Sequence, residues 1–522
     1  MTSGEVLRIE AGADQPAAGD AWERRGRSWA LAVSIVGLVL GSLWIWGYTL
    51  DDSFIGFRYA QNLADGHGLV LNPGERVEGY TNFLWVILLA AVPNLTAHAV
   101  FASKILGLLF NVLTLVVCYL LCGITRTEKA AAYGGALLLT ASNAAFLASG
   151  VDGLETPLFT LLTCCAVLSY LKGLRAARPK DQATWLVASS LLFGLLVMTR
   201  PDGALLYGLI WLHAAWQFRS RPGRLALLSV PFLLVYAPYF LWRWHYYGFF
   251  FPNTFYAKQG GSLLLLTRGA GRIRNFLGLQ AGGLFVAGTV ALAALLFATT
   301  ESTVLGLAVL ARLLFELWSG GEWSGYFRFL VPTLPFLWIL IERFLVGGVR
   351  AAGLGRRGSY LLAGLLGLML GNQVLQFVRL RSQLLEPHRI GFERAHVALG
   401  QWLKGNSPAG ATIAVGDIGA IPFYSGLRVI DTAGLADAHV ARLPGVLYSK
   451  ADSGYVLSQM PQFIILLVRR CEPKAEDFYS AMDKAIAEKA AFQSEYQRLN
   501  CWDYNADYHL LLYSRKKDRS PP

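Results

Sequence analysis

Long apolar segments recur along most of the chain, separated by shorter polar ones. A helix needs about 20 mostly apolar residues to cross a bilayer. About eleven segments approach that length, which predicts transmembrane helices at 29–50, 98–123, 130–148, 156–173, 183–199, 203–217, 225–243, 278–299, 302–318, 329–346 and 359–378. The segment 81–92 is also apolar, but it is shorter and stops at Pro93, which predicts an interfacial or re-entrant helix instead.

The pattern changes from about Glu386 onward to that of a soluble domain. Short runs typical of strands occur at 411–417, 426–431, 463–468 and 508–514, and helical periodicity occurs near 389–404 and 473–490. The C-terminal region is therefore predicted to form a small α/β domain.

Composition and charge place this chain in the membrane. Hydrophobic residues make up 54% of it and charged residues only 15%, against roughly a quarter charged in soluble domains, and the mean hydropathy is +0.43. A soluble enzyme is excluded. The net charge of +12 is better explained by loops that orient a membrane protein than by nucleic acid, so the expected partner is the lipid bilayer.

The basic loops predict the orientation. When the apolar segments are threaded in order, the basic clusters all fall on one side of the membrane: 126–129, 172–180, 219–224 and 350–357. Because Lys and Arg are enriched in cytoplasmic loops, we expect a cytoplasmic N-terminal tail (1–28), a transmembrane domain (29–384) and an exported C-terminal domain (385–522). Cys471 and Cys501 both lie in the exported domain, where a disulfide and two free thiols both remain open.

Polar segments gather in five loops on the outer side, and the first begins with Asp51 and Asp52. With Ser53, they could simply cap a helix at 53–65. Capping explains one carboxylate, whereas two at a membrane surface also suit a general base or a ligand for a hard divalent cation.

Acidic and basic residues also occupy the next two outer loops. Asp152 and Glu155 precede Pro157, where they could mark a helix start or contribute to a shared acidic site. Arg200 and Asp202 in the third loop could be an interfacial anchor with a local ion pair.

The fourth and fifth loops combine cations with aromatic residues. Arg243, His245, Tyr256 and Lys258 could belong to an aromatic belt with snorkelling cations. Positive charge is disfavoured on the outer side, however, and a phosphate on a lipid carrier would explain Arg243 and Lys258 better. In the fifth loop Glu322 and Arg328 could pair with each other, or Arg328 could bind phosphate.

Taken together, the five loops resemble a known superfamily. DDSFIGFRYAQNLADGHGLVLNPGERVEGYTN, SGVDGLETP, TRPDG, YYGFFFPNTFYAK and GGEWSGYFRFLVP are similar to the GT-C polyprenyl-phosphate-dependent glycosyltransferases. The branch that these loops resemble most includes the mycobacterial terminal arabinofuranosyltransferases; protein mannosyltransferases and lipid A aminoarabinose transferases are more distant. Many relatives have GGDW where this chain has GGEW at Glu322.

The resemblance implies a multi-pass glycosyltransferase in the bacterial cytoplasmic membrane. It carries the acidic catalytic residue, which would act as the base, to Asp51, with Asp52 beside it, and a second acidic position to Glu155. The phosphate of a polyprenyl-phosphate sugar, with arabinofuranose as the sugar that the branch implies, would lie near Arg243, His245, Lys258, Arg328 and Arg200. Other substrate contacts would come from Arg58, Tyr59, Asp152, Asp202, Tyr256 and Glu322.

The sequence leaves several alternatives open. The acceptor is an exported glycan or lipid, and both inversion and retention remain open. No His/Cys ligand set is present, and GT-C enzymes differ in metal use, so a divalent cation and the absence of any cofactor both remain open. A multispan lipid or glycolipid transporter and a polymerase or ligase acting on lipid-linked oligosaccharide are the competing functions.

Overall fold

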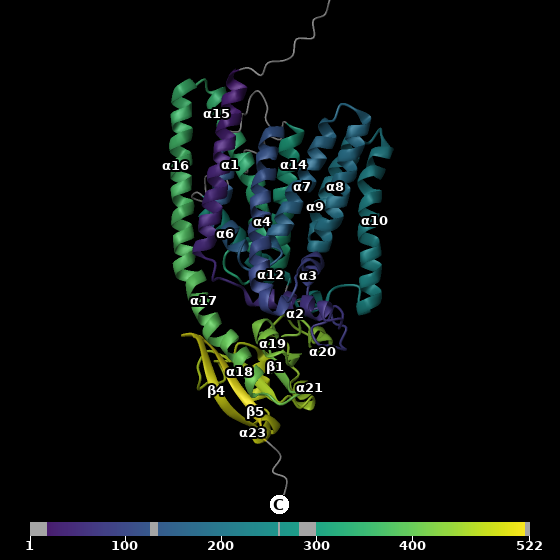
Figure 1. Ribbon diagram of the computed structural model, residues 1–522, viewed down its shortest axis with the longest axis vertical. Helices are drawn as coiled ribbons and strands as arrows, with labels where there is room; N and C mark the ends of the chain where they lie inside the picture. The colour runs from purple at the N-terminus through teal and green to yellow at the C-terminus, as the bar shows by residue number, and fades with distance from the viewer. Residues whose placement is uncertain (1–17, 126–133, 259–261, 281–298, 517–522) are drawn as a thin grey trace, which may run out of the picture.

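The computed structural model describes residues 18–125, 134–258, 262–280 and 299–516. Long helices run side by side as a bundle, and a smaller domain built on a β-sheet lies beyond one end of it (Figure 1). Within the described residues, eight segments are long and apolar enough to cross a membrane. The corresponding helices are α1 (Ala18–Trp44, of which Arg25–Trp44 is the apolar part), α4 (Leu95–Ile124), α7 (Thr156–Arg175), α8 (Pro179–Thr199), α10 (Pro222–Tyr247), α14 (Thr300–Ser319), α15 (Leu334–Ala351) and α16 (Gly355–Leu380).

The expected polytopic helical fold is confirmed, but the expected count of about eleven spans is not. The segment 130–148 is broken into α5 (Gly135–Ala141) and α6 (Ala144–Ser149), because the Asn143 side chain caps α6 by accepting from the backbone N–H of Ala145 at 3.0 Å. At 203–217, α9 (Gly203–Gln217) has only 15 residues. Most of 278–299 lies outside the described residues, next to the end of α12 (Ser262–Leu279).

Two short helices lie between the bundle and the sheet (Figure 1). One is α2 (Asp51–Ala64), and the other is α3 (Phe83–Ala90), whose 8 residues are too few to cross a bilayer. The segment 81–92 thus forms a short helix, as its length and Pro93 predict. Helix α2 buries most of its surface and contacts the sheet domain on one side, so it joins the two parts of the molecule.

The sheet domain, residues 386–516, continues directly from the bundle. An uninterrupted helical stretch leads from α16 through two π-helical turns and α17 (Glu386–Phe392) to α18 (Ala398–Asn406). The five strands follow the order β2-β1-β3-β5-β4. They are β1 (Thr412–Val415), β2 (Arg428–Asp431), β3 (Phe463–Val468), β4 (Tyr496–Asn505) and β5 (Tyr508–Arg515).

The sheet is mixed. Strand β1 pairs parallel with β2 and β3, whereas β5 pairs antiparallel with β3 and β4. Small helices surround these strands: α19 (Ala420–Ser425), α20 (Ala438–Arg442), α21 (Ser453–Ser458), α22 (Ala481–Ala487) and α23 (Ala490–Glu495). All four predicted strands are present. The sequence analysis missed β4 because its long exposed stretch lacks the apolar alternation of a half-buried strand.

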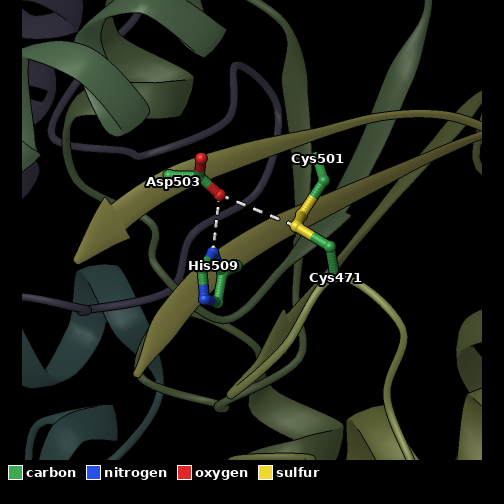
Figure 2. Close-up of side chains that lie close together, drawn as sticks. All are labelled: Cys471, Cys501, Asp503 and His509. Atoms are coloured by element: carbon green, nitrogen blue, oxygen red, sulfur yellow. Dashed lines mark hydrogen bonds and ion pairs between the residues drawn. A yellow bond between two sulfur atoms is a disulfide. The ribbon is translucent and has the colours of Figure 1, made fainter. Parts of the chain in front are cut away.

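A disulfide between Cys471 and Cys501 ties the loop after β3 to β4 (Figure 2). It settles the alternative that the sequence left open. Beside it, the Asp503 carboxylate lies 2.7 Å from His509 Nδ1, and the ligand-capable atoms of these four residues lie within 4.8 Å of one another. Because the two sulfurs are bonded to each other, neither is a thiolate that could bind a metal.

Candidate functional site

The loops singled out in the sequence meet at the end of the bundle that faces the sheet domain. The backbone N–H of Leu50, just before α2, donates to the carbonyl of Asp152 at 3.1 Å, so the first and second loops lie side by side. Trp85 Nε1 in α3 donates to the carbonyl of Gly153 at 3.1 Å and closes the other side of the second loop. The site is therefore built by segments far apart in the sequence.

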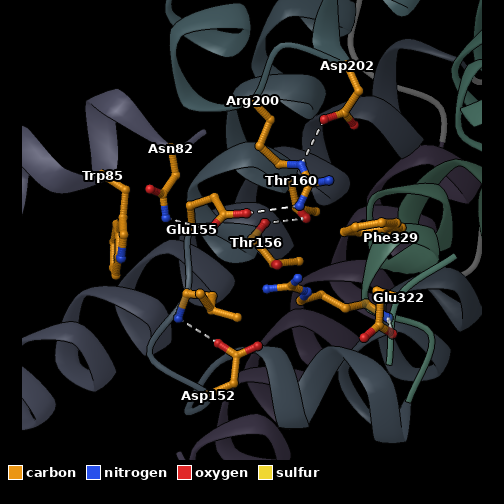
Figure 3. A network of polar contacts seen from close by, with 12 residues as sticks. Asn82, Trp85, Asp152, Glu155, Thr156, Thr160, Arg200, Asp202, Glu322 and Phe329 are labelled. Carbon is orange, nitrogen blue, oxygen red and sulfur yellow. Dashed lines mark hydrogen bonds and ion pairs between the residues drawn. The ribbon is translucent and has the colours of Figure 1, made fainter. Parts of the chain in front are cut away.

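One part of the site is a chain of paired charges (Figure 3). Glu155 Oε1 lies 2.9 Å from Arg200 Nη1, and its Oε2 accepts from Asn82 Nδ2 at 2.9 Å. Arg200 Nε also donates to Asp202 at 3.0 Å, and Asp202 forms a second ion pair with Arg312 of α14. All of these side chains are buried or nearly so, and each charge has an opposite charge beside it.

The pairing fixes the ionisation of the two carboxylates. Burial alone would raise the pKa of Glu155, but the positive charges of Arg200 and Arg328 outweigh it and hold that pKa below its ordinary value. Burial opposes ionisation of Asp202 in the same way, yet Arg200 and Arg312 lower its pKa to about 2. Both groups therefore stay charged at neutral pH.

Arg328 is a buried cation of a different kind. Only 8% of its surface is exposed, and within the residues that the structure describes its buried Nε has no hydrogen-bond partner. Glu155, Glu322 and Asp52 are the carboxylates whose charge reaches it. Glu322, however, accepts from the Arg328 backbone N–H at 3.2 Å and pairs with Arg272 at 2.9 Å. The Arg328 guanidinium thus has donor capacity left for an anion.

Lys258 supplies a second cation near Arg328. It ends α11 (Asn253–Lys258), is exposed, and lies within electrostatic range of Asp52, Arg328 and Arg200. Asn253 fixes this helix, because its Nδ2 donates to the carbonyl of Gly434 in the sheet domain at 2.9 Å. The sheet domain thereby helps to position Lys258.

The carboxylates of Asp51 and Asp52 have different hydrogen-bond partners. The Asp51 carboxylate accepts from the backbone N–H groups of Gly419 at 3.2 Å and Ala420 at 2.8 Å, both in the sheet domain. Asp52 accepts from Trp323 Nε1 at 3.1 Å and lies on the side of the two cations. Gly419 is required there, because a Cβ would lie 2.1 Å from the Asp51 carbonyl oxygen.

Burial raises the pKa of Asp51 to about 7, although His396 opposes the shift. Burial also raises the pKa of Asp152 to about 7. Asp152 is fully buried and accepts from the hydroxyl of Tyr326 and from the backbone N–H of Leu154, whereas Asp51 remains partly exposed. Of these two residues, only Asp51 is therefore partly open to solvent.

The other predicted site residues have structural partners. Arg243 forms a buried ion pair with Glu78 at 2.6 Å and donates to the carbonyl of Phe250, so its donors are already engaged. Arg58 donates to the carbonyls of Leu71, Pro422 and Leu427, which fastens α2 to the sheet domain.

The remaining three residues are Tyr59, Tyr256 and His245. The Tyr59 hydroxyl donates to the carbonyl of Val77 at 2.6 Å. The Tyr256 ring lies 4.8 Å from the Arg442 guanidinium carbon, and His245 is exposed on α10. The structure does not bring His245, Arg243 or Arg58 together with Arg328 and Lys258 as free donors.

Sequence reasoning missed several partners in the site. Arg312 and Glu316 lie within the otherwise apolar α14, and Arg272 of α12 bridges Glu316 at 2.7 Å to Glu322. Ionisable residues inside a span are costly unless they are paired, so their presence in 302–318 was a usable signal. Asn82 and Trp323 carried no such signal.

Comparisons with known proteins agree with the loop motifs. The chain is 32% identical over 249 residues to the terminal β-(1→2)-arabinofuranosyltransferase of Mycobacterium tuberculosis and 28% identical over 241 residues to that of Corynebacterium glutamicum. These matches cover 44% and 41% of this chain, but only 38% and 34% of the relatives' own length. Residues 383–513 match a family model described as a domain of unknown function (DUF8728).

Solved structures show the fold. ArnT from Cupriavidus metallidurans, bound to undecaprenyl phosphate, aligns with a TM-score of 0.58 at 15% identity, over 97% of this chain and 100% of that one. The oligosaccharyltransferase AglB from Archaeoglobus fulgidus, in complex with an inhibitory peptide and a dolichol-phosphate, aligns with a TM-score of 0.51 at 11% identity, over 84% and 69%. Both are GT-C glycosyltransferases, so the fold predicted from the five loops is confirmed.

Proposed function

We propose that this protein is a membrane glycosyltransferase that transfers a sugar from a polyprenyl phosphate to an exported glycan or lipid. The observation that carries the proposal is the pair of cations formed by buried Arg328 and exposed Lys258. A buried guanidinium with unused donors is costly unless an anion uses them. The phosphate of a lipid carrier is the anion expected at a membrane surface.

The comparisons support the donor class. The two relatives carry the name of an arabinofuranosyltransferase, and the ArnT structure that shares this fold was solved with undecaprenyl phosphate bound. Arabinofuranose is therefore the first sugar to test. The basic loops favour the orientation in which the N-terminus is cytoplasmic and the sheet domain is exported.

In the proposed reaction Asp51 is the general base. It removes the proton from an acceptor hydroxyl, whose oxygen then forms a bond to the anomeric carbon of the donor sugar. The bond between that carbon and the phosphate oxygen breaks, and the polyprenyl phosphate leaves with the bonding electrons. A pKa of about 7 suits a base that works near neutral pH.

The other charged residues have supporting roles in this proposal. Arg328 and Lys258 neutralise the leaving phosphate, where charge develops in the transition state. Asp52, held by Trp323, balances the two cations, and Glu155 remains ionised beside Arg200 and orients the donor. Arg200 and Asp202 then form the scaffold that fixes Glu155.

The test uses the purified full-length protein and a panel of radiolabelled polyprenyl-phosphate sugars. Asp51→Asn is compared with Asp65→Asn, which changes an exposed acid at the other end of the same helix. Loss of transfer in the first variant only, with both variants folded, supports the proposal. Full activity of Asp51→Asn would transfer the role of base to Asp52, and no transfer by the wild type from any donor would reject the proposed function.

A further inference from the structure

A hollow of about 360 Å³ lies where the loop after α2 meets the sheet domain. Its walls come from that loop, from the edge strand β2, and from α20 and α21. We call it the junction groove and define it by Glu75, Arg76, Arg428, Asp437, His439 and Tyr455. None of these residues belongs to the cationic site of Arg328 and Lys258.

The groove has rigid walls, because most of its polar groups bond to one another. Arg428 pairs with Glu75 at 2.6 Å, and Glu75 also accepts from Asn72 Nδ2 at 3.0 Å. Asp437 accepts from the Tyr455 hydroxyl at 2.9 Å. These bonds hold the polar groups in place before any ligand arrives, which reduces the entropy cost of binding.

Arg76 differs from its neighbours in the groove. Its guanidinium lies 4.7 Å from the centre of the Tyr246 ring, and its side chain is exposed. Within the part of the chain that the structure describes, no carboxylate pairs with it. Its hydrogen-bond donors therefore remain available to a ligand.

The groove also presents a flat aromatic surface. The rings of His439 and Tyr455 stack with their centres 4.1 Å apart and an angle of 25° between them. His439 Nε2 lies 2.9 Å from Asp452, which fixes the ring while leaving it partly exposed. A flat ring beside hydrogen-bonding groups suits a sugar, whose C–H face packs on the ring while its hydroxyls bond to the rim.

The net charge of the junction groove limits the class of ligand that it can bind. The groove carries two arginines and two carboxylates, Arg76 and Arg428 against Glu75 and Asp437, so its formal charges cancel. A phosphate-rich ligand would find no excess positive charge there, and a lipid chain would have to bury charged groups. An uncharged, hydroxyl-rich ligand fits both conditions.

We infer that the junction groove binds the neutral oligosaccharide acceptor at a distance from the reacting sugar. This inference rests on the proposed function and names the site that holds its acceptor. Asp417, just after β1 in the same domain, does not serve this purpose, because its carboxylate lies 2.7 Å from His396 Nε2 and accepts from the Tyr508 hydroxyl at 2.6 Å. The groove instead uses the two sides of the domain junction as its walls.

The first experiment measures how acceptor length affects transfer. We expect Arg76→Ala and His439→Ala each to raise the KM for a long arabinofuranose oligosaccharide about tenfold, while the KM for a disaccharide and both kcat values remain unchanged. The matched control is Arg498→Ala. Arg498 is an exposed arginine on β4, at the opposite edge of the sheet, and it pairs with Glu472. Equal effects on short and long acceptors, or no effect, would overturn the inference.

A second experiment measures binding without catalysis. Saturation-transfer NMR on the full-length protein uses a long neutral arabinofuranose oligosaccharide and a phosphorylated one. The expected result is a signal from the neutral probe that is lost in Arg76→Ala and kept in Lys258→Ala. Preference for the phosphorylated probe, or binding unaffected by Arg76→Ala, would contradict the inference. Because this readout needs no donor, it remains decisive even if the proposed transferase activity fails.

Discussion

Two buried arginines near the same end of the bundle differ in one respect. Arg243 lies against the carboxylate of Glu78, 2.6 Å away, whereas Arg328 has a buried Nε without a partner among the described residues. A paired buried charge holds neighbouring segments together, and an unpaired one is kept because something else pairs with it. The difference distinguishes the scaffold from the site, although the sequence favoured phosphate binding for Arg243 and left it open for Arg328.

The largest effect is expected from Arg328→Gln. If this cation stabilises the departing phosphate, kcat/KM should fall by about 10²–10³-fold, the usual cost of removing one donor from a transition-state site. The melting temperature should change little, since Arg328 Nε has no hydrogen-bond partner among the described residues and the nearby Glu155 and Glu322 each have another arginine as a partner. Radiolabelled transfer and thermal unfolding measure the two quantities, and a lower melting temperature with normal transfer would reverse the assignment.

Arg243→Gln should act on stability instead. Removing one partner of a buried pair costs about 3–5 kcal/mol, because Glu78 is left charged and alone. Burial already raises the pKa of Glu78 to about 7, so the loss should be smaller at pH 5, where Glu78 becomes neutral, than at pH 8. Adding Glu78→Gln should recover much of the melting temperature. A double variant no more stable than the single one would show that the pair is not the cause.

Lys258→Gln should have an intermediate effect. An exposed cation contributes less than a buried one, so we expect the KM for the polyprenyl-phosphate donor to rise about tenfold or less. The wild type should lose donor affinity as salt increases, and the variant should lose less. Lys180→Gln, in the first turn of α8 on the predicted cytoplasmic side, is the control. If the wild type and Lys258→Gln lost donor affinity equally as salt increases, Lys258 would not bind the donor phosphate.

The smallest expected effect concerns pH and compares two carboxyls of the site. Asp51 has a pKa of about 7 and must be ionised to act as a base, so kcat/KM should fall as the pH drops below about 7. Glu155, whose pKa is lowered, stays ionised throughout this range. Asp51→Glu should shift the acidic limb of the profile while retaining some transfer. If the acidic limb of the Asp51→Glu profile lay at the same pH as in the wild type, the titrating group would not be Asp51.

The sequence predicted what depends on local pattern. Apolar length revealed most of the spans, and short runs typical of strands revealed four of the five strands. The five polar loops also identified one end of the bundle correctly, because the second loop does contact the start of α2. Pattern alone did not show that the 130–148 segment breaks at Asn143, since that break depends on one side chain capping a helix.

The sequence could not assign roles within the site. Arg58, Arg243 and Arg328 are each a cation in a polar loop, and only tertiary contacts show that Arg58 binds three carbonyls and Arg243 a carboxylate. Asp51 and Asp52 are likewise neighbours in sequence, yet they face different parts of the molecule. Such partners lie hundreds of residues away, where no local spacing reports them.

The helical stretch Gly355–Asn406 runs for 52 residues from the bundle into the sheet domain. A helix turns by about 100° per residue. The number of residues in this stretch therefore fixes how the sheet domain is rotated relative to the bundle. Deleting a single residue near Arg381 would turn the whole domain by that angle and carry Gly419 away from Asp51. The number of residues in this helical stretch therefore determines whether the sheet domain can contact the start of α2.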